Sequence, residues 1–340
     1  MLSVLNEFRR GMEELMLPAL HRRVLLYGYE SYTGRFIKWY AKYYHNIDID
    51  YLVSTDMSRG RAYDQEIFRP SVIDFSYKDV NSALIWVAEP LTEETHKYFE
   101  QRGYVKNKTY FDFYEKIYGR DIYEKEVEGT DIFHKRKVGK RDIQFLEWLE
   151  WKRGCNFVTR IPHDFLENGK EHAEGYACTT QKEIFPILDH CHCIPKAEDA
   201  IFDFGCGKGA ALVSFLDYGF DRVGGVEFEA KIYDVLQDNM KKLDIDDTKV
   251  ELLFGDAAKI EEELDSYNWF YFYNPFDEVI LKKCAEHIAN SYRRNKRKMH
   301  IIFFSPKSYT SIEETGVFRL TNQFTVDMRQ RVVGIFESYE

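Results

Sequence analysis

The second half of the chain alternates short apolar runs with amphipathic stretches. The apolar runs predict strands at residues 200–204, 223–228, 250–254, 269–273 and 300–304. Helices are expected from the glycine-rich residues 205–209 to about 218, over 230–243, and from 277 to about 293. Strands that alternate with helices indicate βαβ units and a parallel sheet. Two further strands, at 316–326 and 331–338, have no long helix between them, which predicts a C-terminal antiparallel hairpin.

A shorter alternation of the same kind precedes this half. Strands are expected at residues 24–27, 47–53 and 83–88, with helices at 31–44 and 92–102. The predicted fold is therefore α/β: a doubly wound, seven-stranded, mostly parallel sheet with a terminal hairpin, preceded by a smaller Rossmann-like α/β domain. We place the domains at 1–115 and 156–340, joined by a charged helical connector over 116–155.

Composition narrows the functional class. The 340 residues carry 47 Lys+Arg against 57 Asp+Glu, a net charge of -10, which argues against electrostatic binding of nucleic acid. No run approaches the roughly 20 apolar residues of a membrane span, and the charged first ten residues do not resemble a secretory signal. The six cysteines all follow residue 150 and indicate no disulfide framework, so we expect a cytoplasmic protein.

The run Asp203–Gly209, DFGCGKG, lies at a predicted strand-to-helix turn, where glycines let the backbone approach a ligand. Gly205, Gly207 and Ala210 also satisfy the dinucleotide pattern G-x-G-x-x-A, so the loop alone is ambiguous. The carboxylate of Asp203 disfavours a pyrophosphate and suits a ligand with a positive amino group. Glu227, about 18 residues past the loop at the next strand end, is placed to accept ribose hydroxyl groups.

Residues 176–340 resemble a class I methyltransferase dependent on S-adenosylmethionine (SAM). Asp203-x-Gly205-x-Gly207-x-Gly209 resembles the first motif of that family, and the terminal hairpin resembles its reversed last strand. The resemblance implies SAM as cofactor and methyl transfer as the activity. It implies cofactor contacts for Tyr176 and Thr179 at the methionine end, Glu227 at the ribose, Asp256 and Ala257 at the adenine, and Asn274 in the fourth motif.

The fourth motif bears on the acceptor. Methyltransferases of nucleic-acid and glutamine amino groups carry an Asn-Pro-Pro-aromatic run, whereas this chain has Asn274-Pro275-Phe276. The single proline resembles bacterial members from surface-polysaccharide and natural-product pathways, so the expected acceptor is a small or carrier-linked molecule such as a sugar or glycan precursor. The motif is also loosely similar to that of the non-SET histone-lysine methyltransferases. A protein methyltransferase, an NAD-dependent oxidoreductase and a non-catalytic nucleotide-binding adaptor are the alternatives.

Methyl transfer depends mainly on positioning the acceptor, and a hydroxyl acceptor also needs a base. Asn274 and the Pro275 backbone are expected to hold an acceptor N–H or O–H, and Phe276 to stack on the acceptor or to pack in the core. The candidate bases are His163 and His172, in a polar stretch over residues 160–174 that would form a lid. Asp277 and Glu278 could also serve as a base, but they are expected to cap the helix that starts there.

Three other motifs are explained without a part in the proposed reaction. His190-Cys191-His192-Cys193 lacks a distant second ligand pair, so no metal site is expected. The basic run over residues 293–298 is expected to stabilise a helix C-terminus, with docking of an anionic partner as the alternative. The loop over 28–34 resembles a dinucleotide loop, but Glu30 opposes a pyrophosphate. We therefore expect the N-terminal domain to recognise the acceptor or to form a homodimer.

Overall fold

The computed structural model describes the chain except for residues 1, 30, 55–60, 63–64, 71–79, 90, 120–130, 136–142, 168–170, 327–329 and 340. The chain divides into two compact units. The first consists mainly of Val4–Glu126 and Val138–Lys152, and the second mainly of Arg153–Glu340. Among the described helices, none combines the length and the hydropathy that crossing a membrane requires.

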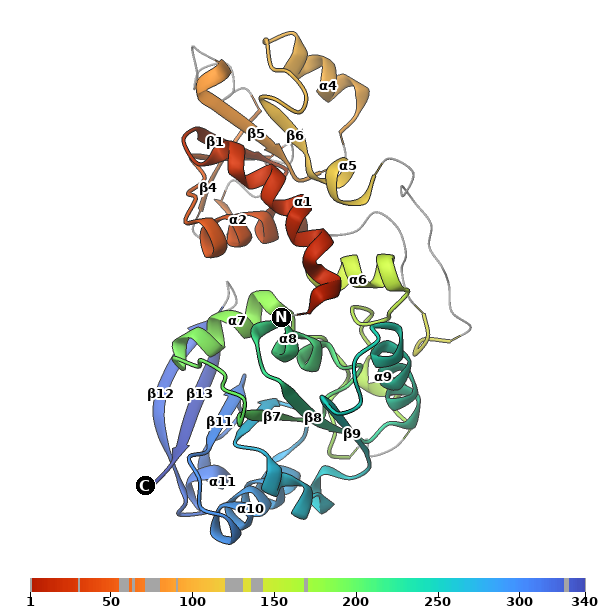
Figure 1. The fold of residues 1–340 in the computed structure, drawn as a ribbon, viewed down its shortest axis with the longest axis vertical. Helices are drawn as coiled ribbons and strands as arrows, with labels where there is room; N and C mark the ends of the chain where they lie inside the picture. Colours follow the sequence, from red (N-terminus) through yellow and green to blue (C-terminus); the bar gives the residue numbers. More distant parts are fainter. Residues whose placement is uncertain are drawn as a thin grey trace. The chain divides into compact units, whose positions relative to one another are not determined.

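The first unit is built on a sheet. Its described strands are β1 (Arg23–Tyr27), β2 (Tyr51–Val53), β3 (Arg61–Ala62), β4 (Gln65–Phe68), β5 (Ala83–Val87) and β6 (Tyr110–Asp112). They follow the order β3-β4-β2-β1-β5-β6; Figure 1 labels β1, β4, β5 and β6. All neighbours pair in parallel except β3, which is antiparallel to β4. All five residues of β5 are buried, as is typical of a parallel strand covered on both faces.

Helices of the first unit share an aromatic core. The described helices are α1 (Asn6–Met16), α2 (Tyr32–His45), α4 (Glu93–Glu100), α5 (Phe113–Tyr118) and α6 (Phe145–Arg153), with short 3-10 turns η2 (Leu17–Ala19) and η4 (Val80–Ser82). The Phe8 ring lies 6.1 Å from that of Phe36 and 5.0 Å from that of Phe145. Helix α6 lies in the stretch expected to be a charged connector, and its first six residues are buried.

The second unit contains the larger sheet. Its described strands are β7 (Ala200–Phe204), β8 (Arg222–Glu227), β9 (Val250–Phe254), β10 (Trp269–Tyr273), β11 (His300–Phe304), β12 (Phe318–Val326) and β13 (Arg331–Ser338). They follow the order β12-β13-β11-β10-β7-β8-β9 (Figure 1). The first five of these strands along the chain pair in parallel, whereas β13 is antiparallel to both β11 and β12. This confirms the predicted seven-stranded, mostly parallel sheet with a C-terminal antiparallel hairpin.

Helices and short turns connect these strands. They are α7 (Gln181–His190), α8 (Ala210–Tyr218), α9 (Ala230–Lys242), α10 (Glu278–Arg294) and α11 (Thr310–Glu313), with 3-10 turns η6 (His163–Phe165), η7 (Ala257–Lys259) and η8 (Glu262–Ser266). Helix α10 buries Leu281, Cys284 and Ile288 in a core that includes Phe202 and Phe270 from the sheet. The apolar stripe of this helix therefore anchors it to the central strands.

The topology places a ligand crevice between β7 and β10. From β7 the chain proceeds outward to β8 and β9, then returns to the opposite side of β7 to form β10 and β11. In open α/β sheets, ligands bind beyond the carboxyl ends of the strands at such a reversal of direction. A ligand-binding site is therefore expected at the residues that follow Phe204 and Tyr273.

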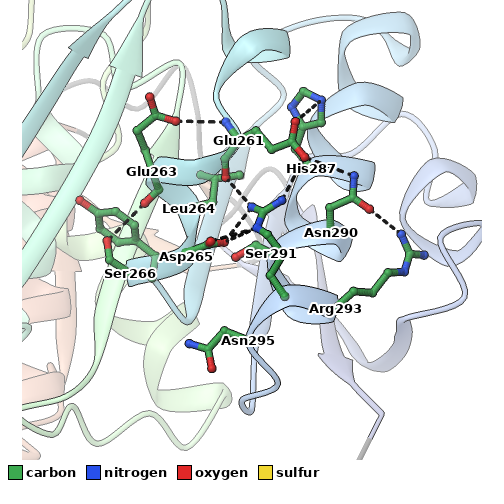
Figure 2. Close-up of polar contacts among 12 residues, drawn as sticks. Glu261, Glu263, Leu264, Asp265, Ser266, His287, Asn290, Ser291, Arg293 and Asn295 are labelled. Carbon is green, nitrogen blue, oxygen red and sulfur yellow. Dashed lines mark hydrogen bonds and ion pairs between the residues drawn. The ribbon is translucent and has the colours of Figure 1, made fainter.

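The three arginines of the basic run over residues 293–298 form hydrogen bonds within the protein. The Arg294 guanidinium donates to Asp265 at 2.8 Å and to Glu261 at 3.0 Å, and Figure 2 shows both acids in this network. Arg293 donates to Glu286 at 2.6 Å, and Arg297 donates to the Leu264 carbonyl at 2.9 Å. The contacts of Arg294 and Arg297 join the end of α10 and the residues after it to η8 and its N-cap, whereas that of Arg293 lies within α10. This agrees with stabilisation of a helix C-terminus and leaves these arginines little capacity for an anionic partner.

Candidate active site

The glycine-rich loop after β7 is shaped by close approaches. Gly207 has a φ of 56°, and a Cβ there would lie 2.4 Å from the ring of Tyr176. Gly205 has a φ of 77°, and a Cβ there would lie 2.7 Å from Cβ of Pro275. Only glycine accommodates both the backbone conformation and these neighbours. The loop thereby brings the end of β7 against Tyr176 on one side and the end of β10 on the other.

Two buried carboxyl groups stand at the ends of β7 and β8. The Glu227 carboxylate accepts hydrogen bonds from the backbone N–H groups of Gly207 at 2.9 Å, Phe228 at 2.9 Å and Glu229 at 2.8 Å. Burial raises the pKa of Glu227 to about 7, against the lowering effect of these N–H groups. Burial, followed by the charge of Glu227, raises the pKa of Asp203 well above its usual value. Such a pair favours a ligand that brings positive charge or hydroxyl donors.

A cavity of about 340 Å³ opens beside these carboxyl groups, and this volume lies in the usual range for small-molecule sites. Ten of the residues predicted from the sequence line it: Tyr176, Thr179, Asp203, Gly205, Gly207, Glu227, Ala257, Asn274, Pro275 and Phe276. They come from the ends of β7, β8 and β10, the turn after β9, and the segment before α7. The structure thus brings together residues that are up to 100 positions apart in the sequence.

Four predicted site residues do not line the cavity: Gly209, Asp256, His163 and His172. Gly209 is the N-cap of α8, and the Asp256 side chain caps η7 by accepting the Ala258 N–H at 2.9 Å. His163 lies in η6, with its Nδ1 3.6 Å from Oδ1 of Asp164. Gly209, Asp256 and His163 thus have local structural roles or contacts, and neither His163 nor His172 lines the cavity.

His172 takes part in a connection between two segments. Its Nδ1 lies 2.6 Å from Oδ2 of Asp277, whose other carboxylate oxygen caps α10 by accepting the N–H groups of Val279 and Ile280. Next to this contact, Ala173 forms a β-bridge with Phe276, and the Glu174 N–H donates to the Pro275 carbonyl at 3.1 Å. His172 therefore helps to attach its own segment to the residues that follow β10.

Residues 156–167 and 171–180, called here the cover segment, form one wall of the cavity. Its two parts pair with each other through an antiparallel bridge between Ile161 and Tyr176. Ile161, Leu166 and Tyr176 pack against Ile232 of α9 in a small apolar cluster. The cover segment is thus held by α9 at one end and by the residues after β10 at the other.

Sequence analysis missed several lining residues. Glu229, two residues after Glu227, is 3% exposed and lines the cavity. Tyr271 and Tyr273 line it from β10. Ser305 follows β11 and has a φ of 56°, like Asn274 with a φ of 41° after β10. A left-handed backbone conformation at a non-glycine residue is uncommon and often marks a functional site. The residue types Asn and Ser do not by themselves predict this conformation, so the sequence did not indicate it.

Arg160, from the polar stretch predicted as a lid, also lines the cavity. Among the described lining residues it is the only lysine, arginine or histidine, and it stands against the acids Glu174, Asp203, Glu227 and Glu229. Among the charged residues that the structure describes in this wall, acids therefore predominate, with one cationic side chain. A ligand that carries one anionic group and one or more cationic groups would match this distribution.

Comparisons with known proteins give the following results. No protein-family model and no curated protein matches the chain. Among solved structures, the ribosomal protein L11 methylase of Lactobacillus delbrueckii subsp. bulgaricus is 12% identical, with a TM-score of 0.37, over 47% of this chain and 79% of that chain. The glycopeptide N-methyltransferase MtfA, solved in complex with SAM, is 10% identical, with a TM-score of 0.37, over 48% and 98% of the two chains.

The mitomycin 7-O-methyltransferase MmcR is 11% identical, with a TM-score of 0.35, over 46% of this chain and 54% of that chain. At these identities and TM-scores the likeness does not carry a function from one protein to another. The functional argument therefore rests on the residues of the cavity.

Proposed function

We propose that the second unit binds SAM and transfers its methyl group to an acceptor held beside Asn274. The strongest support is the pair of buried carboxyl groups, Asp203 and Glu227, which stand at neighbouring strand ends and line one cavity. SAM has an ammonium group, a sulfonium group and two ribose hydroxyl groups, all of which interact favourably with carboxylates. A dinucleotide would instead bring its pyrophosphate charges close to the Asp203 carboxyl, which disfavours NAD.

The proposed cofactor contacts follow from the chemistry of the lining residues. Asp203 would bind the ammonium group, and Glu227 would accept hydrogen bonds from the ribose hydroxyl groups. Ala257, in the turn after β9, would contact the adenine through its backbone, whereas the Asp256 carboxylate caps η7. Tyr176 and Thr179 would cover the methionine end from the cover segment. Each cofactor contact proposed here comes from a residue that lines the cavity, and Asp256, which does not line it, is given none.

Transfer is an in-line displacement, so the main task of the chain is to orient the acceptor. SAM supplies a methyl group on a positively charged sulfur: the acceptor lone pair forms the new bond to carbon, and the electron pair of the broken bond stays on sulfur. The Pro275 carbonyl already accepts the Glu174 N–H, so the Asn274 side chain is the better group to hold the acceptor. Phe276 lines the cavity beside it and offers a stacking surface.

The acceptor must also lose a proton. The described lining residues include no histidine, and the two candidate bases lie outside the cavity wall. A hydroxyl acceptor would therefore have to lose its proton to one of the lining carboxylates, such as Glu174 or Glu229, whereas an amine that is neutral before transfer needs no base for the displacement. We propose a small or carrier-linked acceptor, such as a sugar or glycan precursor, and keep a protein side chain as the alternative. For the first unit we propose a role in recognising that acceptor.

Transfer of a radioactive methyl group tests this proposal. The purified chain is incubated with methyl-labelled SAM and a cell extract, and the label is measured separately in small-molecule, glycan and protein fractions. We expect label in the small-molecule or glycan fraction, and a loss of at least tenfold in Asn274→Ala. Asn295→Ala, which changes an exposed asparagine at the end of α10, is the matched control.

Each other outcome of the transfer assay has a defined meaning. Label in the protein fraction would favour the protein methyltransferase. SAM binding without any labelled product would favour the non-catalytic adaptor. A loss of transfer in the Asn295 control equal to that in the Asn274 variant would remove the argument for Asn274 as the group that holds the acceptor.

A further inference from the structure

A lysine lies inside the glycine-rich loop, and its side chain is buried. Lys208 stands between Gly207 and Gly209 and is 0% exposed. Burial of an ammonium group is costly unless polar groups replace its water, so lysine is rarely buried in proteins. Lys208 does not line the cavity, and the cofactor contacts proposed above do not use it. The contacts of the Lys208 ammonium group therefore indicate its role.

The ammonium group of Lys208 binds the cover segment. Its Nζ donates to Oδ1 of Asn156 at 2.9 Å and to the carbonyl of Thr159 at 3.0 Å. It also lies 5.2 Å from the centre of the Tyr176 ring, within the range of a cation–π interaction. Asn156 and Thr159 belong to the first part of the cover segment and Tyr176 to the second. One charge thus contacts both parts.

A second set of hydrogen bonds fixes the same place. The Asn239 side chain, on α9, accepts the Asn156 N–H at 2.7 Å and donates to the carbonyls of Asn156 at 2.9 Å and Lys208 at 3.0 Å. The Tyr176 hydroxyl donates to the Phe157 carbonyl at 2.6 Å. Asn156 is 5% exposed and Asn239 is 0% exposed, so water competes little for these bonds.

We propose that Lys208 is a positioning residue that fastens the cover segment to the glycine-rich loop and thereby holds the cofactor wall in its binding geometry. This inference rests on the proposed function, because it concerns the affinity for SAM. The cover segment contributes Arg160, Tyr176 and Thr179 to the cavity. If the segment is attached for only a fraction of the time, the apparent affinity for SAM falls to that fraction of its full value.

The direct test replaces Lys208 by methionine, which keeps the length of the side chain and removes the charge. We expect SAM affinity to fall by about 10- to 100-fold, since two charge-assisted hydrogen bonds are lost and their acceptors stay buried. Amide hydrogen exchange of the free protein should accelerate in residues 156–167 and 171–180. Strands β10 and β11 should keep their protection, which a general loss of stability would not allow.

A second lysine provides a matched control. Lys231 also binds the cover segment, through a 2.7 Å ion pair with Glu167, but the two side chains are 40% and 58% exposed. Exposed pairs of this kind contribute little. Lys231→Met should therefore leave SAM affinity within about threefold of the wild type and leave exchange in residues 171–180 unchanged.

The outcomes separate this inference from the proposed function. If the wild type does not bind SAM, the proposed function fails, and the exchange measurement still decides whether Lys208 holds the cover segment. If folded Lys208→Met binds SAM as the wild type does, or if exchange accelerates equally across the sheet, the inference is wrong. If Lys208→Met does not fold, Asn156→Ala removes one partner of the ammonium group and must show the same localised exchange and weaker SAM binding.

Discussion

The carboxyl group of Glu227 should make cofactor binding depend on pH near neutrality. It is 9% exposed, and burial raises its pKa to about 7. The ribose hydroxyl groups of SAM are hydrogen-bond donors, and the ionised carboxylate, with acceptor sites on both oxygens and a full charge, binds them more strongly than the protonated acid does. Lowering the pH of the free protein through this range therefore removes the form that binds, and SAM affinity should fall.

The magnitude follows from the pKa. When only the ionised form binds, the apparent Kd is multiplied by one plus ten to the power of the pKa minus the pH. This factor is about 1.1 at pH 8 and about 11 at pH 6, so affinity should fall about tenfold, or about 1.4 kcal/mol. The same linkage requires that SAM binding releases protons from Glu227 between these two pH values.

Calorimetric titration at pH 6, 7 and 8 measures this effect. Glu227→Gln is the control, because glutamine cannot ionise: it should bind SAM more weakly than the wild type at pH 8 and with a much smaller dependence on pH. Methylthioadenosine has the ribose but not the amino-acid part of SAM, so its pH dependence reports on Glu227 without a contribution from Asp203, whose pKa burial also raises; its affinity should fall about tenfold from pH 8 to pH 6. A flat wild-type profile, or an undiminished slope in Glu227→Gln, would refute the assigned role.

Three other predictions concern single residues of the same unit. Gly207→Ala should weaken SAM binding at least tenfold, because the added Cβ lies 2.4 Å from the Tyr176 ring; calorimetry that shows unchanged affinity would contradict the close approach. Arg160→Gln should weaken SAM more than methylthioadenosine, since only SAM has a carboxylate that the Arg160 guanidinium could bind; equal losses for the two ligands would exclude that pairing. His172→Ala should leave SAM affinity within threefold and lower the free energy of unfolding by less than about 1 kcal/mol, because its ion pair is half exposed; a larger effect in either denaturation or titration would assign it a further role.

The sequence predicted the central strands of the second sheet well because these strands are buried. β7, β10 and β11 begin and end at the predicted residues, since parallel strands covered on both faces appear as unbroken apolar runs. β9, at the edge of the sheet, is only partly buried, but its bounds also agree with the prediction. The prediction was weaker in the first unit. A strand was expected over residues 47–53, but β2 spans only Tyr51–Val53. Asp50 instead accepts the Val24 N–H at 2.7 Å, a contact between segments that residue patterns do not reveal.

Helices with mixed faces were harder to predict. α1 (Asn6–Met16) buries Phe8, Met12, Leu15 and Met16, but charged residues separate these positions and the sequence analysis did not identify the helix. In α6 the charged residues themselves are buried: Glu147 and Glu150 lie inside together with the apolar residues, so charge does not mark the exposed face. In both helices, tertiary packing decides which side chains are inside.

The candidate site was predictable where residue types follow strand ends. Asp203, Glu227 and Asn274 line the cavity because the carboxyl ends of parallel strands meet at one edge of the sheet. Contacts between distant segments were not predictable. His172 pairs with Asp277 across 105 positions, and the part played by Lys208 depends on a segment about 50 residues earlier.

Titration of the purified chain with SAM and with NAD, in the wild type and in Glu227→Ala, tests the central claim most directly. We expect the wild type to bind SAM and not NAD. Removing the Glu227 carboxylate should cost roughly 1–3 kcal/mol, or about 5- to 150-fold in SAM affinity. Absence of SAM binding by the wild type, or binding of NAD in its place, would contradict the assignment of this cavity to SAM and the methyltransferase proposal with it.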